Sequence, residues 1–150
     1  MTFLERPYRL FACLAVAAFA VAHVGSEVFV RLWIGRDGVG QAIGETLYYA
    51  ATQPLGTAML LVPFALLGWM AASLARKKAL RSGMVLFAAG SAVLGLIYFW
   101  GHIVAQQAMQ DRMWTAAALS VGLLPFESVP VLAVAFVARL LMGRKVAVQA

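Results

Sequence analysis

The stretch "MTFLERPYRLFACLAVAAFAVAHVGSEVFVRLW", residues 1–33, contains an apolar run that is longer than the core of a typical signal peptide. The run continues through His23 and Glu27 to Trp33, so we expect a retained first helix rather than a cleaved leader. A bilayer core about 30 Å thick requires roughly 20 apolar residues of helix to cross it. The stretch therefore predicts a membrane-spanning helix that carries ionisable side chains.

The rest of the chain has the same apolar character. Of its 150 residues, 63% are hydrophobic and 12% are charged, far from the balance of a soluble domain. Four segments are long and apolar enough to cross a bilayer: 8–32, 45–74, 84–106 and 113–141. Short connections force neighbouring helices to run antiparallel. We therefore expect an all-α protein, with residues 1–150 forming one integral membrane up-down-up-down four-helix bundle.

The placement of the basic residues predicts how the bundle is oriented. The formal net charge is +6, and nine of the twelve Lys and Arg residues fall on one side of the expected bundle. These nine are Arg6, Arg9, Arg76, Lys77, Lys78, Arg81, Arg139, Arg144 and Lys145. By the positive-inside rule, both termini and the loop "ARKKALRS" (75–82) lie in the cytoplasm, and we place the protein in a bacterial inner membrane. We expect contact with anionic membrane lipids and no nucleic-acid partner.

Prolines and the single cysteine restrict what the bundle can contain. Pro54 and Pro63 interrupt the second segment, and Pro125 and Pro130 interrupt the fourth. Because proline bends a spanning helix, both segments can bow outward and leave a pocket between them. Cys13 is the only cysteine, which excludes an internal disulfide and a cysteine metal cluster.

His23, Glu27 and Arg31 are spaced four residues apart, so they stack on one helix face at roughly 6 Å per step. In one interpretation Arg31 extends to the outer membrane interface and neutralises Glu27, while His23 is hydrogen-bonded in the packed bundle. In the other, His23 and Glu27 line a cavity, because ionisable groups at membrane depth usually face an interior space.

Three further polar residues could join them. Glu45 opens the second segment, where an acidic residue also favours the helix dipole. Glu127 lies well inside the fourth segment, so it must be paired, protonated or exposed to a cavity. His102 fits either a packed core or a ligand site. We predict that His23, Glu27, Glu45, His102 and Glu127 converge on one internal site, mostly in the outer half of the membrane.

Residue types alone leave the chemistry of such a site open. Histidine and carboxylate together can move a proton near neutral pH or hold a protonated amine or a cation. The same residues fit haem ligation by His23 and His102, or a divalent metal held by His23, Glu27 and His102.

The order of motifs resembles the EXPERA-type four-helix membrane domains, a group that includes the emopamil-binding protein and the sigma-2 receptor. The resemblance rests on "HVGSEVF" (23–29), "ETLYYAATQPL" (45–55), "GSAVLGLIYF" (90–99) and "PVLAVAFVARL" (130–140). It covers residues 15–142, and the spacing from Glu-Thr to Pro-Leu is its most specific part. It implies a membrane pocket for a sterol-like or isoprenoid-like ligand or an amine, with double-bond isomerase activity as the candidate reaction.

By that likeness His23, Glu27 and Glu45 are the candidate catalytic residues. His23 and Glu27 would act as base and acid, with Glu45 as electrostatic partner to a carbocation. Tyr48, Trp100 or Phe126 would offer the cation an aromatic face, and His102 and Glu127 complete the predicted ligand-binding set. No cofactor or bound metal is expected in this interpretation.

Two other interpretations stay open. One is a b-type haem or metal protein that uses His23 and His102. The other is a small accessory subunit of a larger membrane complex, or a homo-oligomer, because helices rich in Ala and Gly permit close helix contact.

Overall fold

The computed structural model describes residues 6–77 and 79–148, and for residues 144–148 only the course of the backbone. Lys78 and both predicted cytoplasmic ends (1–5 and 149–150) lie outside the described residues, as do the side chains of Arg144 and Lys145. Within the described ranges the chain is helical and contains no strand. The predicted all-α class is confirmed.

The first rod is continuous and changes helix type along its length. It consists of α1 (Arg6–Phe19), the π-helical segment η1 (Ala20–Gly25), α2 (Ser26–Val30) and a second π-helical segment η2 (Arg31–Gly35). The remaining elements are α3 (Val39–Thr52), α4 (Pro54–Arg76), α5 (Leu80–Gln110), α6 (Trp114–Gly122), α7 (Leu124–Glu127) and α8 (Val129–Val148).

Four helices are long and apolar enough to cross a membrane: Arg6–Gly35, Pro54–Arg76, Leu80–Gln110 and Leu124–Gly143. Large apolar side chains also cover the outside of the described chain, including Val21, Leu55, Leu96 and Val134, each at least two-thirds exposed. Soluble monomers rarely expose large areas of apolar surface. These features indicate a membrane protein.

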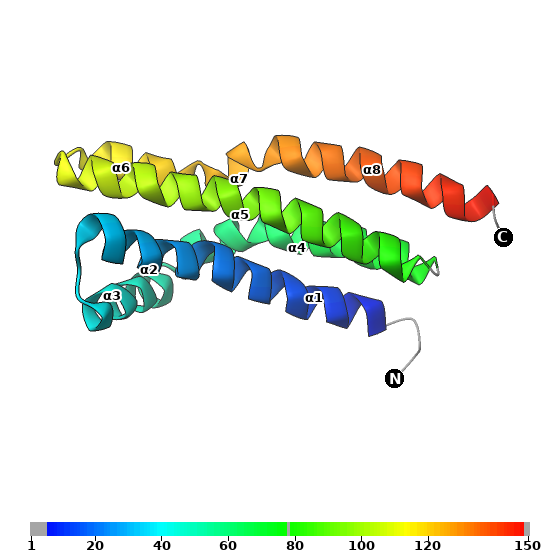
Figure 1. The fold of residues 1–150 in the computed structure, drawn as a ribbon, viewed down its shortest axis with the longest axis horizontal. Coiled ribbons are helices and arrows are strands. Elements are labelled where there is room, and N and C mark those ends of the chain that lie inside the picture. Colours follow the sequence, from blue (N-terminus) through cyan, green and yellow to red (C-terminus); the bar gives the residue numbers. More distant parts are fainter. Residues whose placement is uncertain (1–5, 78, 149–150) are drawn as a thin grey trace.

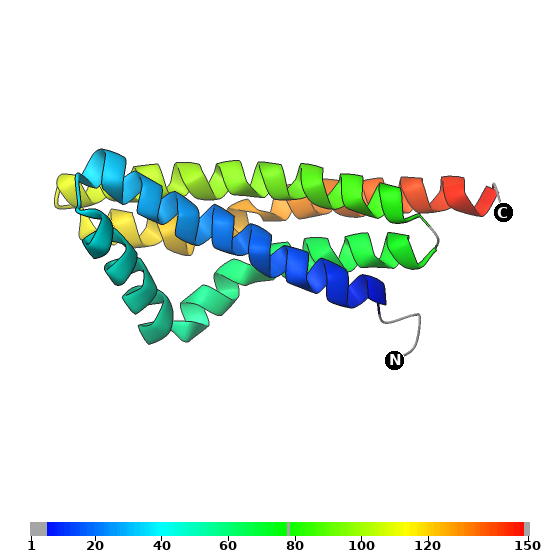
Figure 2. The same cartoon turned by 60° about the horizontal axis from the view of Figure 1, so that its bottom comes forward.

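The predicted second segment, 45–74, is wrong as a single helix. The backbone leaves helical geometry at Gln53, with φ −120° and ψ 60°, and α4 begins at Pro54. Proline disfavours the helical conformation in the residue before it, which explains why α3 ends there. Figure 2 shows α3 and α4 meeting in a wide V. Pro63, by contrast, lies inside α4 without ending it.

The predicted fourth segment, 113–141, is also divided. Pro125 lies in the first turn of α7 and Pro130 is the second residue of α8, so each proline occupies a helix start, where its missing N–H costs least. The candidate span begins only at Leu124. The segment α6 therefore precedes this span.

In Figure 1 the first rod, α4, α5 and α8 lie side by side, with the start of α1 and the end of α8 at the same end of the molecule. The core contains the fully buried Phe11, Phe64, Leu67, Leu94 and Tyr98. The Tyr98 hydroxyl donates a hydrogen bond of 2.6 Å to the backbone oxygen of Leu60. This contact joins α5 to α4, and Tyr98 lies four residues before His102 in α5.

Candidate functional site

Residues at every fourth position of the first rod form a row, here called the ladder, that ends at the polar site. Phe11, Ala15, Phe19, His23 and Arg31 are all buried on it, and Glu27 fills the remaining step. In an α-helix each step of four residues rotates the ladder by about +40° around the axis. A π-helix has about 4.4 residues per turn and rotates it by about −30°. The alternation of α and π segments therefore keeps His23, Glu27 and Arg31 on the same buried face as the apolar residues before them.

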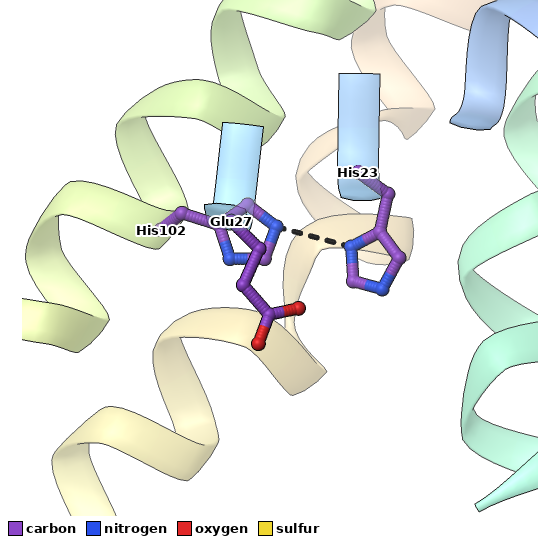
Figure 3. Close-up of side chains that lie close together, drawn as sticks. All are labelled: His23, Glu27 and His102. Atoms are coloured by element: carbon purple, nitrogen blue, oxygen red, sulfur yellow. Dashed lines mark hydrogen bonds between the residues drawn. The ribbon is translucent and has the colours of Figure 1, made fainter. Parts of the chain in front are cut away.

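His23 and His102 meet across the bundle. His23 Nδ1 and His102 Nε2 are 3.0 Å apart, within hydrogen-bond distance, and both side chains are buried. Figure 3 shows the Glu27 carboxylate beside the two rings. One ligand atom from each of the three residues lies within 4.8 Å of the others. The prediction that these residues converge holds for this part of the set.

Arg31 joins Glu27 to the second carboxylate of the predicted site. Its Nε donates a hydrogen bond of 3.1 Å to Glu27 Oε1, and one terminal nitrogen donates to Glu45 Oε2 at 2.5 Å. The same nitrogen lies 3.7 Å from Asp37. Arg31 is 8% exposed, so it neutralises Glu27 inside the protein.

Glu45 stands at the edge of this cluster. Its side chain is 42% exposed, and Gln41 donates a hydrogen bond of 3.0 Å to its Oε1. The hydrogen bonds from Gln41 and Arg31 hold the pKa of Glu45 below its ordinary value of 4.5. Glu45 thus supports Arg31 and does not line the cavity.

A cavity of about 450 Å³ opens beside the cluster, within the size range of small-molecule sites. His23, Glu27, Arg31 and His102 form a polar part of its wall, and apolar residues of α4, α5 and α6 form much of the rest. Thr46 also lines it, and the buried Thr46 hydroxyl has no hydrogen-bond partner among the described residues. A buried hydroxyl without a partner is costly, so a ligand group that bonds to it would be stabilised.

Four predicted ligand-binding residues do not reach this cavity. They are not among the residues that line it, and all four are exposed: Tyr48, Trp100, Phe126 and Glu127. Two residues along a helix correspond to a rotation of about 200°. Tyr48, Trp100 and Phe126 each lie two positions from a buried residue, respectively Thr46, His102 and Leu124, and this rotation turns them outward.

The cavity includes residues that sequence reasoning missed. Tyr49 and Trp114 supply its aromatic faces, and Gln106 adds an amide. Arg31 also lies over the Tyr49 ring, 5.9 Å from its centroid. Helical spacing could have found two of them, because Tyr49 follows Glu45, and Gln106 follows His102, by four residues.

The arrangement can move or hold a proton. Two imidazole rings in contact can pass a proton along their shared hydrogen bond, and each ring keeps a second nitrogen for another partner. Glu27 is already paired with Arg31, which leaves the histidine pair as the proton-carrying unit. A bis-histidine haem would require the rings to separate, since their facing nitrogens lie 3.0 Å apart and two axial nitrogens on one iron need about 4 Å.

Comparison with known proteins finds no protein-family model that matches the chain, and no curated protein or solved structure with significant similarity.

Proposed function

We propose that this protein is an inner-membrane four-helix bundle of up-down-up-down topology whose cavity binds a hydrophobic small molecule. The main support is the cavity itself, which is lined by His23, by His102, by Thr46 with its unpartnered hydroxyl, and by many apolar side chains. A mostly apolar pocket with a few convergent polar groups is typical of a small-molecule site. The ligand class that fits is sterol-like or isoprenoid-like, with a hydroxyl or an amine at one end.

Double-bond isomerisation is the reaction that this site would support best. It needs one group to protonate a carbon and another to remove a proton from a different carbon. The contacting pair His23 and His102 supplies both roles in one proton relay, with Glu27 stabilising positive charge nearby. Tyr49 and Trp114 take the place of the aromatic residues expected from the EXPERA resemblance.

Binding of a sterol with a free hydroxyl and of a long-chain tertiary amine, measured on the protein in lipid nanodiscs, tests the proposal. Thr46→Val should weaken sterol binding by a factor of about 5 to 10, the cost of one lost hydrogen bond. Glu27→Gln should weaken amine binding by about 1 to 3 kcal/mol. In Ala118→Trp, the new indole occupies the cavity and should abolish binding of both the sterol and the amine.

Glu127→Gln is the matched control, because Glu127 is exposed and does not line the cavity. If the three cavity variants bind both probes as the unchanged protein and the control do, the cavity is not the binding site. For the isomerase reaction, a sterol alkene turned over in deuterated water should acquire solvent deuterium, and His23→Ala should abolish that incorporation.

A further inference from the structure

The two histidines of this chain, the only two in its sequence, are in direct contact although 79 residues separate them. A carboxylate, Glu27, completes a compact group with them. Two imidazoles and one carboxylate are the donor set of many zinc and non-haem iron sites. Proton relay explains the contact between the rings, but it does not require a carboxylate beside them. An ion bound between the rings would take the place of their shared proton, so the metal site and the relay are alternative uses of the same pair.

We propose that His23, Glu27 and His102 form a binding site for a divalent transition-metal ion. Metal–nitrogen bonds of about 2.0 to 2.1 Å place two ligand atoms about 2.9 to 3.4 Å apart in octahedral or tetrahedral geometry. The observed separation of 3.0 Å between His23 Nδ1 and His102 Nε2 lies in that range. The Glu27 ligand oxygen lies within 4.8 Å of the ring nitrogens, so a shift of the carboxylate toward them would complete the set. Glu27 Oε1 accepts a hydrogen bond from Arg31, as metal-ligating carboxylates do from their partners.

The charges around the site match a dication. The Arg31 guanidinium lies within ion-pair distance of three carboxylates, Glu27, Asp37 and Glu45. These four side chains together carry two more negative than positive charges. A buried divalent ion is costly without compensating charge, and this group supplies it.

The donor set also selects the metal. Imidazole nitrogens favour Zn²⁺, Co²⁺ and Fe²⁺, whereas Mg²⁺ and Ca²⁺ prefer sites made of oxygen atoms. Three protein ligands leave at least one position open, as in catalytic zinc sites. Because all three residues line the cavity, that position would face any molecule bound there. The metal site does not depend on the hydrophobic-ligand proposal, since its ligands are complete without such a molecule.

Titration of the untagged, metal-free full chain in nanodiscs with Co²⁺ tests the site. We expect one Co²⁺ per chain and visible d–d absorption whose intensity reports the coordination number. Zn²⁺ should compete and erase the signal. Both facing ring nitrogens must be unprotonated to bind the ion, so the proton between them moves to the far nitrogen of its own ring. Because protonation of either ring competes with the metal, the affinity should fall as the pH is lowered.

Three variants locate the ligands. His23→Ala and His102→Ala should each weaken Co²⁺ binding more than the 10- to 100-fold typical of a lost supporting contact. Glu27→Gln should weaken it and alter the spectrum, because an amide is a poorer ligand than a carboxylate. The matched controls Glu127→Gln and Cys13→Ala should bind as the unchanged protein does, since both residues are exposed and outside the group.

The unchanged protein gives the decisive result even if a histidine variant does not fold. Absence of stoichiometric Co²⁺ or Zn²⁺ binding to it would overturn the proposal. Co²⁺ binding by both folded histidine variants that is as tight as binding by the unchanged protein, with folding verified by circular dichroism, would do the same. Failure of the sterol and amine assays leaves this measurement unaffected, so the two proposals fail separately.

Discussion

Arg31 organises the acidic residues of the site, and Glu45 is the one among them whose protonation should be measurable from solution. Hydrogen bonds from Gln41 and from Arg31 keep the pKa of Glu45 low. A carboxyl whose pKa is lower in the folded state stabilises that state above its unfolded pKa, and this stabilisation is lost as the pH falls through the folded pKa. Acidification below about pH 4.5 should therefore loosen the contact between α3 and the first rod.

We predict that the melting temperature of the protein in detergent falls between pH 6 and pH 3, and that it falls less in Glu45→Gln. The variant keeps the shape of the side chain but has no proton to gain in this range. Circular dichroism melts at matched ionic strength provide the measurement. Equal pH dependence in the two proteins would mean that the ion pair of Glu45 with Arg31 does not contribute to folding.

For single residues, the sequence is a good guide to which side chains have functional chemistry. It is a poorer guide to which of these side chains come into contact. The four-residue spacing places His23, Glu27 and Arg31 on one face, and the structure confirms it. Contact with His102 depends on how α5 is rotated against the first rod, which no local pattern specifies. Residue type alone favours Trp100 and Phe126 as pocket residues, but their position around the helix turns them outward.

Glycine permits helices of the bundle to pack at close range. A Cβ atom on Gly68 of α4 would lie 2.9 Å from the backbone oxygen of Phe11 in α1, closer than such atoms normally approach. Small residues permit this approach of helix backbones in membranes, where packing rather than the hydrophobic effect holds helices together. The contact also fixes α4 against the rod that carries His23.

We predict that Gly68→Ala destabilises the protein by about 1 to 3 kcal/mol, because the helices must separate to admit the methyl group. Gly44→Ala is the matched control, since nothing lies within 4 Å of the added atom there. In that open helical position alanine should stabilise by about 0.5 to 1 kcal/mol. Unfolding in mixed micelles by a denaturing detergent compares the two. A Gly68→Ala protein as stable as the Gly44→Ala protein would contradict the packing.

Element boundaries show where sequence patterning has limits. Hydropathy is continuous from α3 into α4, so a count of apolar residues merges them, whereas the backbone at Gln53 responds to the proline that follows. The π segments leave no hydropathy signal either. The π-helical segments keep the ladder on the buried side over the whole first rod. They therefore depend on how the rod packs against the other helices, not on a local pattern.

For the whole molecule, the arrangement of the helices places the charges in two groups. The start of α1, the end of α4, the start of α5 and the end of α8 lie at one end of the bundle, and the turn between α5 and α6 lies at the other (Figure 1). Of the described basic residues, Arg6, Arg9, Arg76, Lys77, Arg81 and Arg139 belong to the first end. The site cluster lies toward the second end, together with Arg31, Arg36 and Arg112.

This asymmetry leads to a prediction about orientation, because cytoplasmic loops of membrane proteins carry the excess of Lys and Arg. A reporter that is active only in the cytoplasm should be active when fused after Ala150 and inactive when inserted near Gly38. A periplasmic reporter at the same two positions should give the reverse pattern, which controls for expression. If both reporters instead place the Gly38 turn in the cytoplasm, the orientation is inverted. The cavity and its histidine pair would then open toward the cytoplasmic leaflet, and a ligand would have to enter from that side.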